Sequence, residues 1–537
     1  RMRAPAWAWR RCMRLAQRPS RPDLRRLRAA HAAFVAHGLH RHTYALSRLL
    51  LLATSFAASS TATSDQFLSY ASLLFRHAEA PLNSFLYNTL IMAFARSSHP
   101  HAALFYFRLM LQHQHSCSGQ CGEEGEEAPS AVVVPDHLTY PFVLHACASL
   151  PSRSPGKQVH ALVYRNGLAS ADHFVQTALL RFYVSLMGEV VGGAHKLFEE
   201  IPVRDAVHWD VLMNGYLRQD LPSQALRLFH QLLVAGVEPD AFNYATALAA
   251  CARAGALDQG IWIHEYLKKK SDKLLLSDPH ICTTLVSMYA KCGCIDKAAG
   301  VFDGVTQRSS FLWAAMIGGF AIHGHAREAI GCLKRMQMED GLKPDGIALL
   351  GALSACSHAG LVEEGRLLLD RMQTHYGVAP GHEHYSCTVD LLCRVGRLEE
   401  AVELIRSMPM RPLASAWGSV LTGCRTYRNV ELAELAVKEM LRMEMDLGAR
   451  VADGVHVQLW NIYMDTNRQE DARRILKSMS SGGTKKMPGC SVIEVDGVVN
   501  SFVSGDQGHP LRIRIYEALD ILADHVLQRP MEEIQGW

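Results

Sequence analysis

The sequence predicts an all-α fold, a right-handed α-solenoid superhelix of helix-turn-helix repeats, followed by a short C-terminal extension that contains a β-hairpin. Three observations carry this prediction. At 537 residues the chain is too long for one ordinary hydrophobic core. It resembles itself at an interval near 104 residues, which three units of about 35 residues would produce. Near its end, alternating apolar and polar residues surround an Asp-Gly pair, the pattern of a hairpin.

The interval of 104 residues comes from three kinds of recurring residue. A tryptophan begins a helix rich in small residues, Pro-Asp ends a helical pair, and Ala-Cys lies in an apolar helix. Each recurs three times at spacings of 104 or 105 residues: Trp209, Trp313 and Trp417; Asp136, Asp240 and Asp345; Cys147, Cys251 and Cys356. Because one helical pair cannot bury both of its faces, neighbouring units must stack on one another.

Each unit is expected to contain two amphipathic helices, as residues 206–240 illustrate. Apolar residues recur there at helical spacing on both sides of Leu221-Pro222, which marks a turn. Ser223 is expected to cap the second helix and Gly236 to end it, with Pro239 preventing its continuation. We expect the recurring tryptophans to lie in the core between helices rather than in a cofactor-binding box.

The first 28 residues differ from the rest of the chain. They contain ten arginines and one acidic residue, Asp23. An Arg-rich, acid-poor segment predicts an organelle transit peptide, with a disordered basic tail as the alternative. Its low serine content favours the mitochondrion over the chloroplast. The apolar run at 49–58 is too short to span a bilayer, so we expect no membrane insertion.

Composition limits the functions that remain. The 55 basic and 52 acidic residues nearly balance, so a nucleic-acid-binding surface would have to be local. The 14 cysteines include no CxxC pair and lie mostly in apolar helical runs, which predicts buried free thiols in a reducing compartment. Cys117 and Cys121 lack further ligands at metal-binding spacing. The sequence therefore predicts neither a metal site nor another cofactor.

Several segments resemble one known family. "VHWDVLMNGYLRQDLPSQALRLFHQLLVAGVEPD" (207–240) closely resembles a pentatricopeptide repeat, and the alternating unit lengths resemble the plant PLS subfamily. "GALSACSHAGLVEEG" (351–365) and "HEHYSCTVDLLCRVGRLEEAVELIRSMP" (382–409) are similar to its last long and last short units. "LASAWGSVLTGCRTYRNVELAELA" (413–436) is similar to its first E motif. The resemblance covers roughly residues 25–530.

The resemblance implies a division of the chain. It places degenerate N-terminal units at 29–83, the repeat array at 84–413, E-motif helical pairs at 414–481 and a PG-box or E+ extension at 482–537. An insertion at about 112–133, rich in Gly, Ser and Glu, is expected to form a solvent-exposed loop. The individual units are expected at 43–83, 84–136, 137–172, 173–205, 206–240, 241–278, 279–309, 310–345, 346–381 and 382–413.

In this family each unit reads one base of single-stranded RNA, through polar residues that hydrogen-bond its Watson–Crick edge. The resemblance assigns this role to the fifth and last residues of each unit. The pairs are Ser47 with Asn83, Asn88 with Asp136, Thr177 with Asp205, Asp210 with Asp240, Thr283 with Ser309, Ala314 with Asp345, and Ser386 with Leu413. The long units carry Pro141 with Asp172, Ala245 with Asp278, and Leu350 with Gly381.

The family's preferences imply adenine, uracil and guanine for the first three pairs. If the last short unit faces the fourth base before an edited cytidine, these bases lie at −13, −12 and −10. Asp210 and Ala314 replace the usual Asn, and Leu413 replaces the usual acidic residue, so their units are expected to discriminate poorly. A polar residue that merely starts a helix is the alternative interpretation of each position.

The sequence predicts no enzyme. Family members with a DYW domain resemble zinc cytidine deaminases, whose signature is H-x-E followed by P-C-x-x-C. His77-Ala78-Glu79 matches only the first part and lies inside a repeat, and no phosphate-binding or hydrolase motif is present. The resemblance implies that a DYW-type deaminase acts in trans. Pro488-Gly489 of the PG box and the hairpin turn Asp496-Gly497 are the expected docking region for it and for other editing-complex proteins.

The expected function is therefore site recognition for C-to-U editing of an organellar transcript. Three alternatives remain open from the sequence. The chain could stabilise, process or splice organellar RNA without editing it. It could be a protein-binding helical scaffold, since similar arrays bind peptides. It could also be a truncated deaminase from an incomplete gene model.

Overall fold

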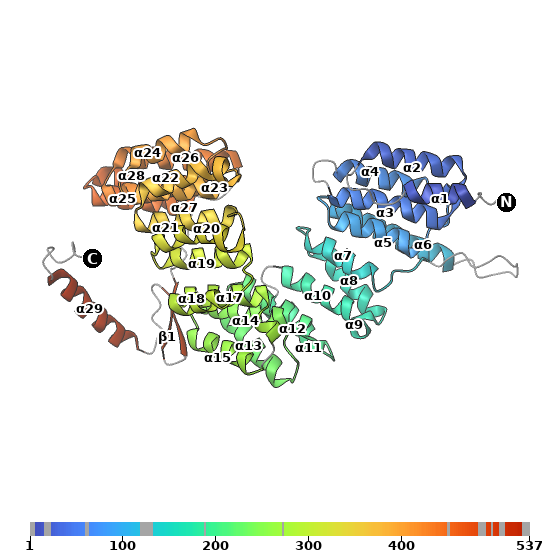
Figure 1. Ribbon diagram of the computed structural model, residues 1–537, viewed down its shortest axis with the longest axis horizontal. Helices are drawn as coiled ribbons and strands as arrows, with labels where there is room; N and C mark the ends of the chain where they lie inside the picture. Colours follow the sequence, from blue (N-terminus) through green and yellow to red (C-terminus); the bar gives the residue numbers. More distant parts are fainter. Residues whose placement is uncertain are drawn as a thin grey trace. The chain divides into compact units, whose positions relative to one another are not determined.

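The structure is a computed structural model that describes residues 6–15, 23–59, 64–118, 133–186, 190–270, 273–447, 452–481, 490–495, 498–503 and 511–528. Helices make up most of these residues (Figure 1). The chain divides into two compact parts, Arg1–Asn243 and Tyr244–Trp537, which are described separately below.

The helices of the N-terminal part follow one another with short connections. They are α1 (Ala6–Leu15), α2 (Leu24–Ala36), η1 (Leu39–Arg41), α3 (Thr43–Ser59), α4 (Ser64–Arg76), α5 (Ser84–Ala95), α6 (Pro100–Ser118), α7 (Thr139–Ala148), α8 (Ser154–Arg165), α9 (Leu168–Ala171), α10 (His173–Ser185), η2 (Val190–Ala194), α11 (His195–Glu200), α12 (Ala206–Arg218) and α13 (Pro222–Val234).

The C-terminal part begins within α14 (Ala241–Ala254). Its further elements are α15 (Leu257–Lys269), α16 (Lys273–Leu276), α17 (Pro279–Lys291), α18 (Ile295–Asp303), α19 (Ser310–Ile322), α20 (Ala326–Asp340), α21 (Gly346–Ala359), α22 (Val362–Arg371), η3 (Met372–Tyr376), α23 (His382–Arg394), α24 (Leu398–Ser407), α25 (Ala414–Tyr427), α26 (Val430–Leu447), α27 (Ala452–Asp465), α28 (Gln469–Ser481), β1 (Cys490–Val495), β2 (Val498–Val503) and α29 (Arg512–Gln528).

Helical pairs stack in sequence order within each part. In the N-terminal part α3, α5, α7, α10 and α12 each contact the next of these helices, and most also contact the second helix of their own pair. The C-terminal part contains the same kind of row, in which each helix contacts the next: α17, α19, α21, α23, α25 and α27. Figure 1 shows part of this row. The predicted array of helical pairs is confirmed.

Glycines on second helices give the interval of 104 residues a packing reason. A Cβ added at Gly365 of α22 would lie 2.5 Å from the Leu391 side chain of α23. Equivalent glycines stand 105 and 209 residues earlier, at Gly260 and Gly156, where an added Cβ would lie 2.5 Å from Met288 and 2.0 Å from Phe182. In each case a side chain from the first helix of the next unit lies where a Cβ would be and would have to move to make room for one.

The recurring tryptophans form part of the core, as expected. Trp209, Trp313 and Trp417 are 4%, 0% and 6% exposed. Phe198 and Phe302 meet the first two in edge-to-face contacts with ring centroids 4.7 Å apart. The prediction that these tryptophans are buried in the core is confirmed.

The expected cap of the second helix in 206–240 is wrong. Helix α13 begins at Pro222, with Leu221 in the cap position, so Ser223 lies inside the first turn. Proline favours the first helical position because its φ is already helical and it has no N–H to satisfy there. The expected end of the helix is confirmed, since Gly236 has a φ of 71° directly after it.

The insertion at 112–133 is not a loop throughout. Helix α6 continues to Ser118, seven residues into the segment expected to be irregular. A hydrogen bond between the Tyr87 hydroxyl and His113 Nδ1, 3.1 Å long, ties this extension to α5. The rest of the insertion, at 119–132, lies outside the described residues.

The cysteines match the expectation of free thiols. The eleven that the structure describes are free, and eight of them are buried. Burial raises the pKa of several of these thiols, for example that of Cys147 to about 11, which makes them poor nucleophiles. None of the helices in the described ranges combines the length and the apolar composition needed to cross a bilayer.

Both ends of the described chain carry further elements. The boundary expected at residue 28 falls inside α2, whose Leu27 is buried. Strands β1 and β2 pair antiparallel, with Cys490 opposite Val503 and Val495 opposite Val498. The four positions expected to form the docking region, Pro488, Gly489, Asp496 and Gly497, lie outside the described residues.

Candidate nucleic-acid interface

The last residue of nearly every unit caps the first helix of the next unit. Its side-chain oxygen accepts a hydrogen bond from a backbone N–H two or three residues later, where the first turn leaves donors unsatisfied. The capping residues are Asn83, Asp136, Asp172, Asp205, Asp240, Asp278, Ser309 and Asp345. The polar character of these positions therefore has a structural cause that is independent of any ligand.

Leu413 and Gly381 are the exceptions among these end positions. Both occupy the cap position, of α25 and α23 respectively, without a side-chain hydrogen bond to the helix. Leu413 is 43% exposed and has no polar atom to offer. Its unit is one of those expected to discriminate poorly between bases. The hydroxyl of its partner, Ser386, lies 3.5 Å from that of Ser415.

Asn88 and Asp136 are brought into direct contact. The Asn88 side-chain amide donates to Asp136 Oδ1 at 3.0 Å and lies 3.3 Å from Oδ2. Burial alone would raise the pKa of Asp136. Hydrogen bonds from the Thr139 hydroxyl and backbone N–H, from Asn88 and from the Leu138 N–H outweigh it and lower that pKa. The pair thus presents an amide donor beside an ionised carboxylate.

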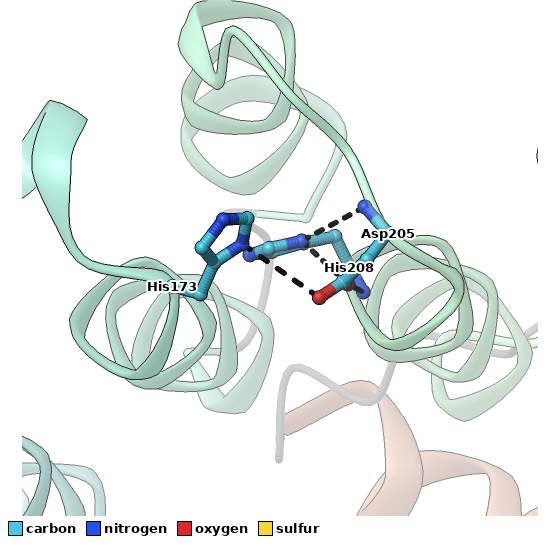
Figure 2. A group of neighbouring side chains, drawn as sticks. All are labelled: His173, Asp205 and His208. Atoms are coloured by element: carbon cyan, nitrogen blue, oxygen red, sulfur yellow. Dashed lines mark hydrogen bonds and ion pairs between the residues drawn. The ribbon is translucent and has the colours of Figure 1, made fainter.

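Thr177 and Asp205 are joined through a third residue, His208, which is fully buried. Figure 2 shows His208 beside Asp205. Its Nε2 lies 3.4 Å from the Thr177 hydroxyl, and its Nδ1 lies 2.7 Å from Asp205 Oδ1 and 3.3 Å from the Asp205 backbone nitrogen. Burial lowers the pKa of His208, although the neighbouring Asp205 carboxylate opposes this shift. The ring is therefore neutral near pH 7.

Three other fifth-position side chains bond within their own helix. Ser47 donates to the Tyr44 carbonyl at 2.7 Å, and Thr283 donates to the Pro279 carbonyl at 2.6 Å. Asp210 accepts from the Asn214 side-chain amide at 2.9 Å. Ala314 has no polar side-chain atom. Among the predicted pairs in the described chain, one is therefore joined by a direct hydrogen bond, Asn88 with Asp136. A second, Thr177 with Asp205, is joined through His208.

Large apolar side chains are exposed at the second position of most units. These positions were not singled out from the sequence, although counting from the expected unit starts would have found them. They are between 41% and 72% exposed: Tyr44, Phe85, Leu138, Phe174, Val207, Phe242, Phe311 and Ile347. Exposed apolar groups are costly in water and are suited to stacking on the faces of bases.

His173, Asp205 and His208 form a group that could hold a divalent cation, because one ligand atom from each lies within 4.8 Å of the others. Figure 2 shows His173 facing the Asp205 carboxylate, with Nδ1 and Oδ2 3.7 Å apart. However, Asp205 Oδ1 already accepts from the His208 backbone N–H at 3.0 Å, and His208 Nδ1 accepts from the Asp205 N–H. We assign this group to helix capping.

Comparison with known protein families gives two matches. The profile described as PPR repeat matches residues 85–115, 207–237, 280–308, 311–340, 352–375 and 383–413. The profile described as E motif matches 427–494. Five of the six repeat matches begin one residue after an expected unit start.

Curated relatives cover most of the chain. The putative pentatricopeptide repeat-containing protein At3g28640 of Arabidopsis thaliana is 46% identical over 505 residues, which span 94% of this chain and 95% of that protein. From the same plant, the pentatricopeptide repeat-containing protein At1g59720, chloroplastic/mitochondrial, is 35% identical and the match covers 83% and 67% of the two chains. The protein At2g22410, mitochondrial, is 33% identical, with coverage of 93% and 88%.

Solved structures share the fold. The pentatricopeptide repeat protein PPR10 in complex with an 18-nucleotide psaJ RNA element has a TM-score of 0.60 at 17% identity, and the match covers 85% of this chain and 64% of that one. PPR10 from maize alone has a TM-score of 0.51. At this identity the likeness shows the fold only.

Proposed function

Since the chain belongs to the pentatricopeptide repeat family, in the PLS class with an E motif, we propose that it binds single-stranded RNA in a sequence-specific manner. PPR10, whose fold it shares, was solved with an RNA element bound. The observation that carries the proposal most directly is the pair formed by Asn88 and Asp136. It places a hydrogen-bond donor and an acceptor side by side at the start of a first helix.

The chemistry of this pair suits uracil. The second N–H of the Asn88 amide can donate to a uracil carbonyl, while the Asp136 carboxylate accepts from N3–H. Phe85 and Leu138 are exposed at the second positions of this unit and of the next, at 49% and 50%, and can stack on the faces of the base. Phosphate contacts by Lys and Arg would supply the sequence-independent part of the affinity.

Guanine suits the pair of Thr177 and Asp205 by the same argument. Its Watson–Crick edge offers N1–H and N2–H to the carboxylate and O6 to the hydroxyl. Adenine is proposed for Ser47 with Asn83. The predicted RNA therefore carries A and U in succession, then one unspecified base, then G.

Binding to short RNAs tests this proposal. The full-length protein is titrated with an RNA carrying A, U and G at this spacing, and with RNAs that each change one of the three bases. We expect each change to weaken binding about fivefold or more, equivalent to about 1 kcal/mol. Equal affinity for all of the RNAs, with a shallow salt dependence, would instead support a protein-binding scaffold.

We further propose that this binding directs C-to-U editing in an organelle. The E motif supports this role, because an RNA clamp alone has no evident use for a segment beyond its repeats. A DYW-type deaminase would be recruited in trans, and the chain itself would contribute no catalytic group. The Arg-rich first residues favour the mitochondrion, and two of the relatives carry organellar names.

A loss-of-function plant provides the test of editing. Transcriptome-wide comparison with wild type should show at least one cytidine that loses conversion, with A, U and G at −13, −12 and −10. Unchanged editing together with loss or mis-splicing of a transcript would support the alternative role in RNA stability or splicing.

A further inference from the structure

The third residue of certain units is a buried polar side chain. Among the described residues, four units carry one, and these side chains are between 0% and 8% exposed: Thr139, His208, Asn243 and His384. Each lies in the first turn of a first helix, three residues after the last residue of the preceding unit. Burying a polar group without a hydrogen bond is costly, so its partners show what the position does.

All four residues bond to the end of the preceding unit. Thr139 and Asn243 each accept from the backbone N–H of the preceding Asp, at 3.0 and 3.1 Å, through their side-chain oxygens. His208 and His384 accept in the same way through Nδ1, at 3.3 and 3.0 Å. These bonds close the helix start on itself and need no ligand.

The four residues fall into two groups according to the partner of their second side-chain hydrogen bond. Asn243 Nδ2 donates to the Ala206 carbonyl at 2.9 Å, and His384 Nε2 lies 2.9 Å from the Gly346 carbonyl, so both reach only backbone. Thr139 and His208 instead reach the fifth residue of the preceding unit. The Thr139 hydroxyl lies 2.7 Å from Asn88 Oδ1, and His208 Nε2 lies 3.4 Å from the Thr177 hydroxyl.

The two groups also differ in their predicted base selectivity. In two units the fifth residue is hydrogen-bonded by Thr139 or His208, and these units carry the pairs expected to select uracil and guanine. The two units whose third-position partner is backbone carry Asp210 with Asp240, where Asp replaces the usual Asn, and Leu350 with Gly381, which have no polar side-chain atom. We propose that Thr139 and His208 are positioning residues for base recognition, which fix the hydrogen-bonding direction of Asn88 and Thr177; this inference rests on the proposed function.

The mechanism at Asn88 concerns the orientation of its amide. Asn88 is 8% exposed, with Nδ2 donating to Asp136 and Oδ1 2.7 Å from the Thr139 hydroxyl. That hydroxyl also lies 2.9 Å from Asp136 Oδ1, and we assign its single hydrogen to the shorter contact, with Asn88. With both ends of the amide engaged, the hydrogen left for a base is an N–H donor, which matches a uracil carbonyl. Without the Thr139 hydroxyl, Oδ1 would be buried without a donor. Turning the amide over would then cost only its bond to Asp136, and the Oδ1 acceptor that this presents to the base matches the N4 amino group of cytosine.

The mechanism at Thr177 is analogous. If the Asp205 N–H donates to His208 Nδ1, as in the capping box, the ring carries its hydrogen on Nε2 and donates to the Thr177 hydroxyl oxygen, whose own hydrogen can point towards guanine O6. The 2.7 Å between His208 Nδ1 and Asp205 Oδ1 instead favours a hydrogen on Nδ1; Nε2 then accepts from Thr177, and the hydroxyl oxygen faces the base as an acceptor. In both units a buried neighbour converts a side chain with two possible hydrogen-bonding roles into one with a defined role.

The decisive variant is Thr139→Val, which keeps the shape of the side chain and removes only its hydroxyl. Affinities of the full-length protein are measured for two RNAs that differ only in U or C at −12. We expect the ratio of affinities for U over C to be at least fivefold lower in Thr139→Val than in wild type. A base change at −10 should weaken binding by the same factor in both proteins. Thr139→Ser should retain the wild-type ratio.

Asn243→Ala provides the matched control. It removes a buried third-position side chain that also closes a helix start through the Asp240 N–H, but one that bonds to no fifth-position residue. It should lower the unfolding midpoint while leaving the U-to-C ratio at −12 unchanged. If Thr139→Val keeps the wild-type ratio, or if Asn243→Ala loses it equally, the proposal is overturned.

A second measurement separates this inference from the proposed function. A double-mutant cycle with Asn88→Ala, Thr139→Val and the double variant is read from denaturant midpoints of the RNA-free protein. Non-additive shifts support the coupling of Asn88 to Thr139, and additive shifts overturn it, whether or not RNA binds. Wild-type protein that shows no base preference would instead contradict the proposed function.

Discussion

Asp205 serves two purposes in a single side chain, because it caps α12 and is a proposed base reader. Asp205→Asn separates the two, since Asn caps a helix about as well as Asp but offers an amide in place of a carboxylate. We expect the preferred base at −10 to change from G to A, as for the pair of Ser47 and Asn83. Stability should change by less than about 0.5 kcal/mol.

Affinities for RNAs carrying each of the four bases at −10 check this prediction. Asp345→Asn is the matched control, because Asp345 also caps a helix but is paired with Ala314, which has no polar side-chain atom. It should leave every base preference unchanged. Retention of the G preference by Asp205→Asn would argue that this residue only starts the helix.

His264 makes stability depend on pH. It is 8% exposed, its Nδ1 lies 2.8 Å from the Tyr289 hydroxyl, and burial lowers its pKa from 6.5 to about 4. Between these values the unfolded chain binds a proton that the folded chain does not. Stability is therefore fully present above about pH 6.5 and is lost as the pH falls towards 4, by about 2 kcal/mol at pH 5.

The check is the difference in unfolding free energy between pH 7 and pH 5 for wild type and His264→Gln. The variant should lose less stability on acidification, since glutamine does not titrate. His230→Gln, at an exposed position of α13, should behave as wild type. Equal acid sensitivity of all three proteins would place the pH dependence elsewhere.

At this scale the sequence predicted one direct contact but not the other connections between the predicted positions. Counting within the repeat identified Asn88 and Asp136, and a contact between them follows from stacking of adjacent units. The link from Thr177 to Asp205 through His208 could not be predicted. It depends on the orientation of a buried ring, which helical periodicity does not constrain.

The turns within helical pairs form a recurring element of their own. In the described chain, five of these turns contain a glycine with positive φ, such as Gly324 at 73°, between the first and second helix. In three pairs another residue adopts this conformation: Asp220, Arg428 and Asn467, with φ between 56° and 59°. Arginine carries the steric cost of this region, whereas aspartate and asparagine tolerate it better.

Arg428→Gly should therefore raise the free energy of unfolding by about 1 kcal/mol. Denaturant unfolding measures the change, and Arg428→Ala should give no comparable gain because alanine bears the same strain. Conversely, Gly324→Ala should destabilise by a similar amount, although an added Cβ there would meet no atom within 4 Å. A gain from Arg428→Ala equal to that from glycine would attribute the effect to the lost charge.

Element boundaries were predicted less well than element types. The helix starting at Pro222 and the helix continuing to Ser118 both exceeded their expected limits. In the first case the proline itself provided the start. In the second, the hydrogen bond of His113 to Tyr87 stabilises a segment whose composition alone suggests a loop. Tertiary contacts of this kind are not visible in a local window of sequence.

For the whole molecule, RNA recognition and the C-terminal extension are expected to be separable. The proposed reading positions lie between residues 47 and 413, whereas 487–537 includes β1, β2 and α29. Helix α29 exposes large apolar side chains, including Ile513 and Tyr516 at 69% and 55%. Deletion of 487–537 should leave RNA affinity within about twofold of wild type, which corresponds to about 0.4 kcal/mol, and abolish editing.

Complementation of a loss-of-function plant with the shortened chain measures editing, and titration with the target RNA measures affinity. An unrelated deletion within the insertion at 119–132 serves as a control for chain length. Loss of affinity and editing together would count against a separate docking role for the extension.

The periodicity of the sequence predicted the array as a whole, because each unit needs its neighbours to cover its apolar faces. It did not predict the division into two compact parts at Asn243. The repeat pattern continues across this division without interruption, since it records nearest-neighbour packing and nothing of longer range.

The capping role of the last residue in each unit has a consequence for how such proteins can change their targets. A residue at this position that also caps the helix must have a short polar side chain. The favoured residues are therefore Asp, Asn, Ser and Thr. Mutations that change the preferred base without loss of stability are thus expected to exchange one of these few capping residues for another. At Leu413, at the end of the array, a helix forms without a polar cap, and this unit is one of those expected to lose a hydrogen bond to a base.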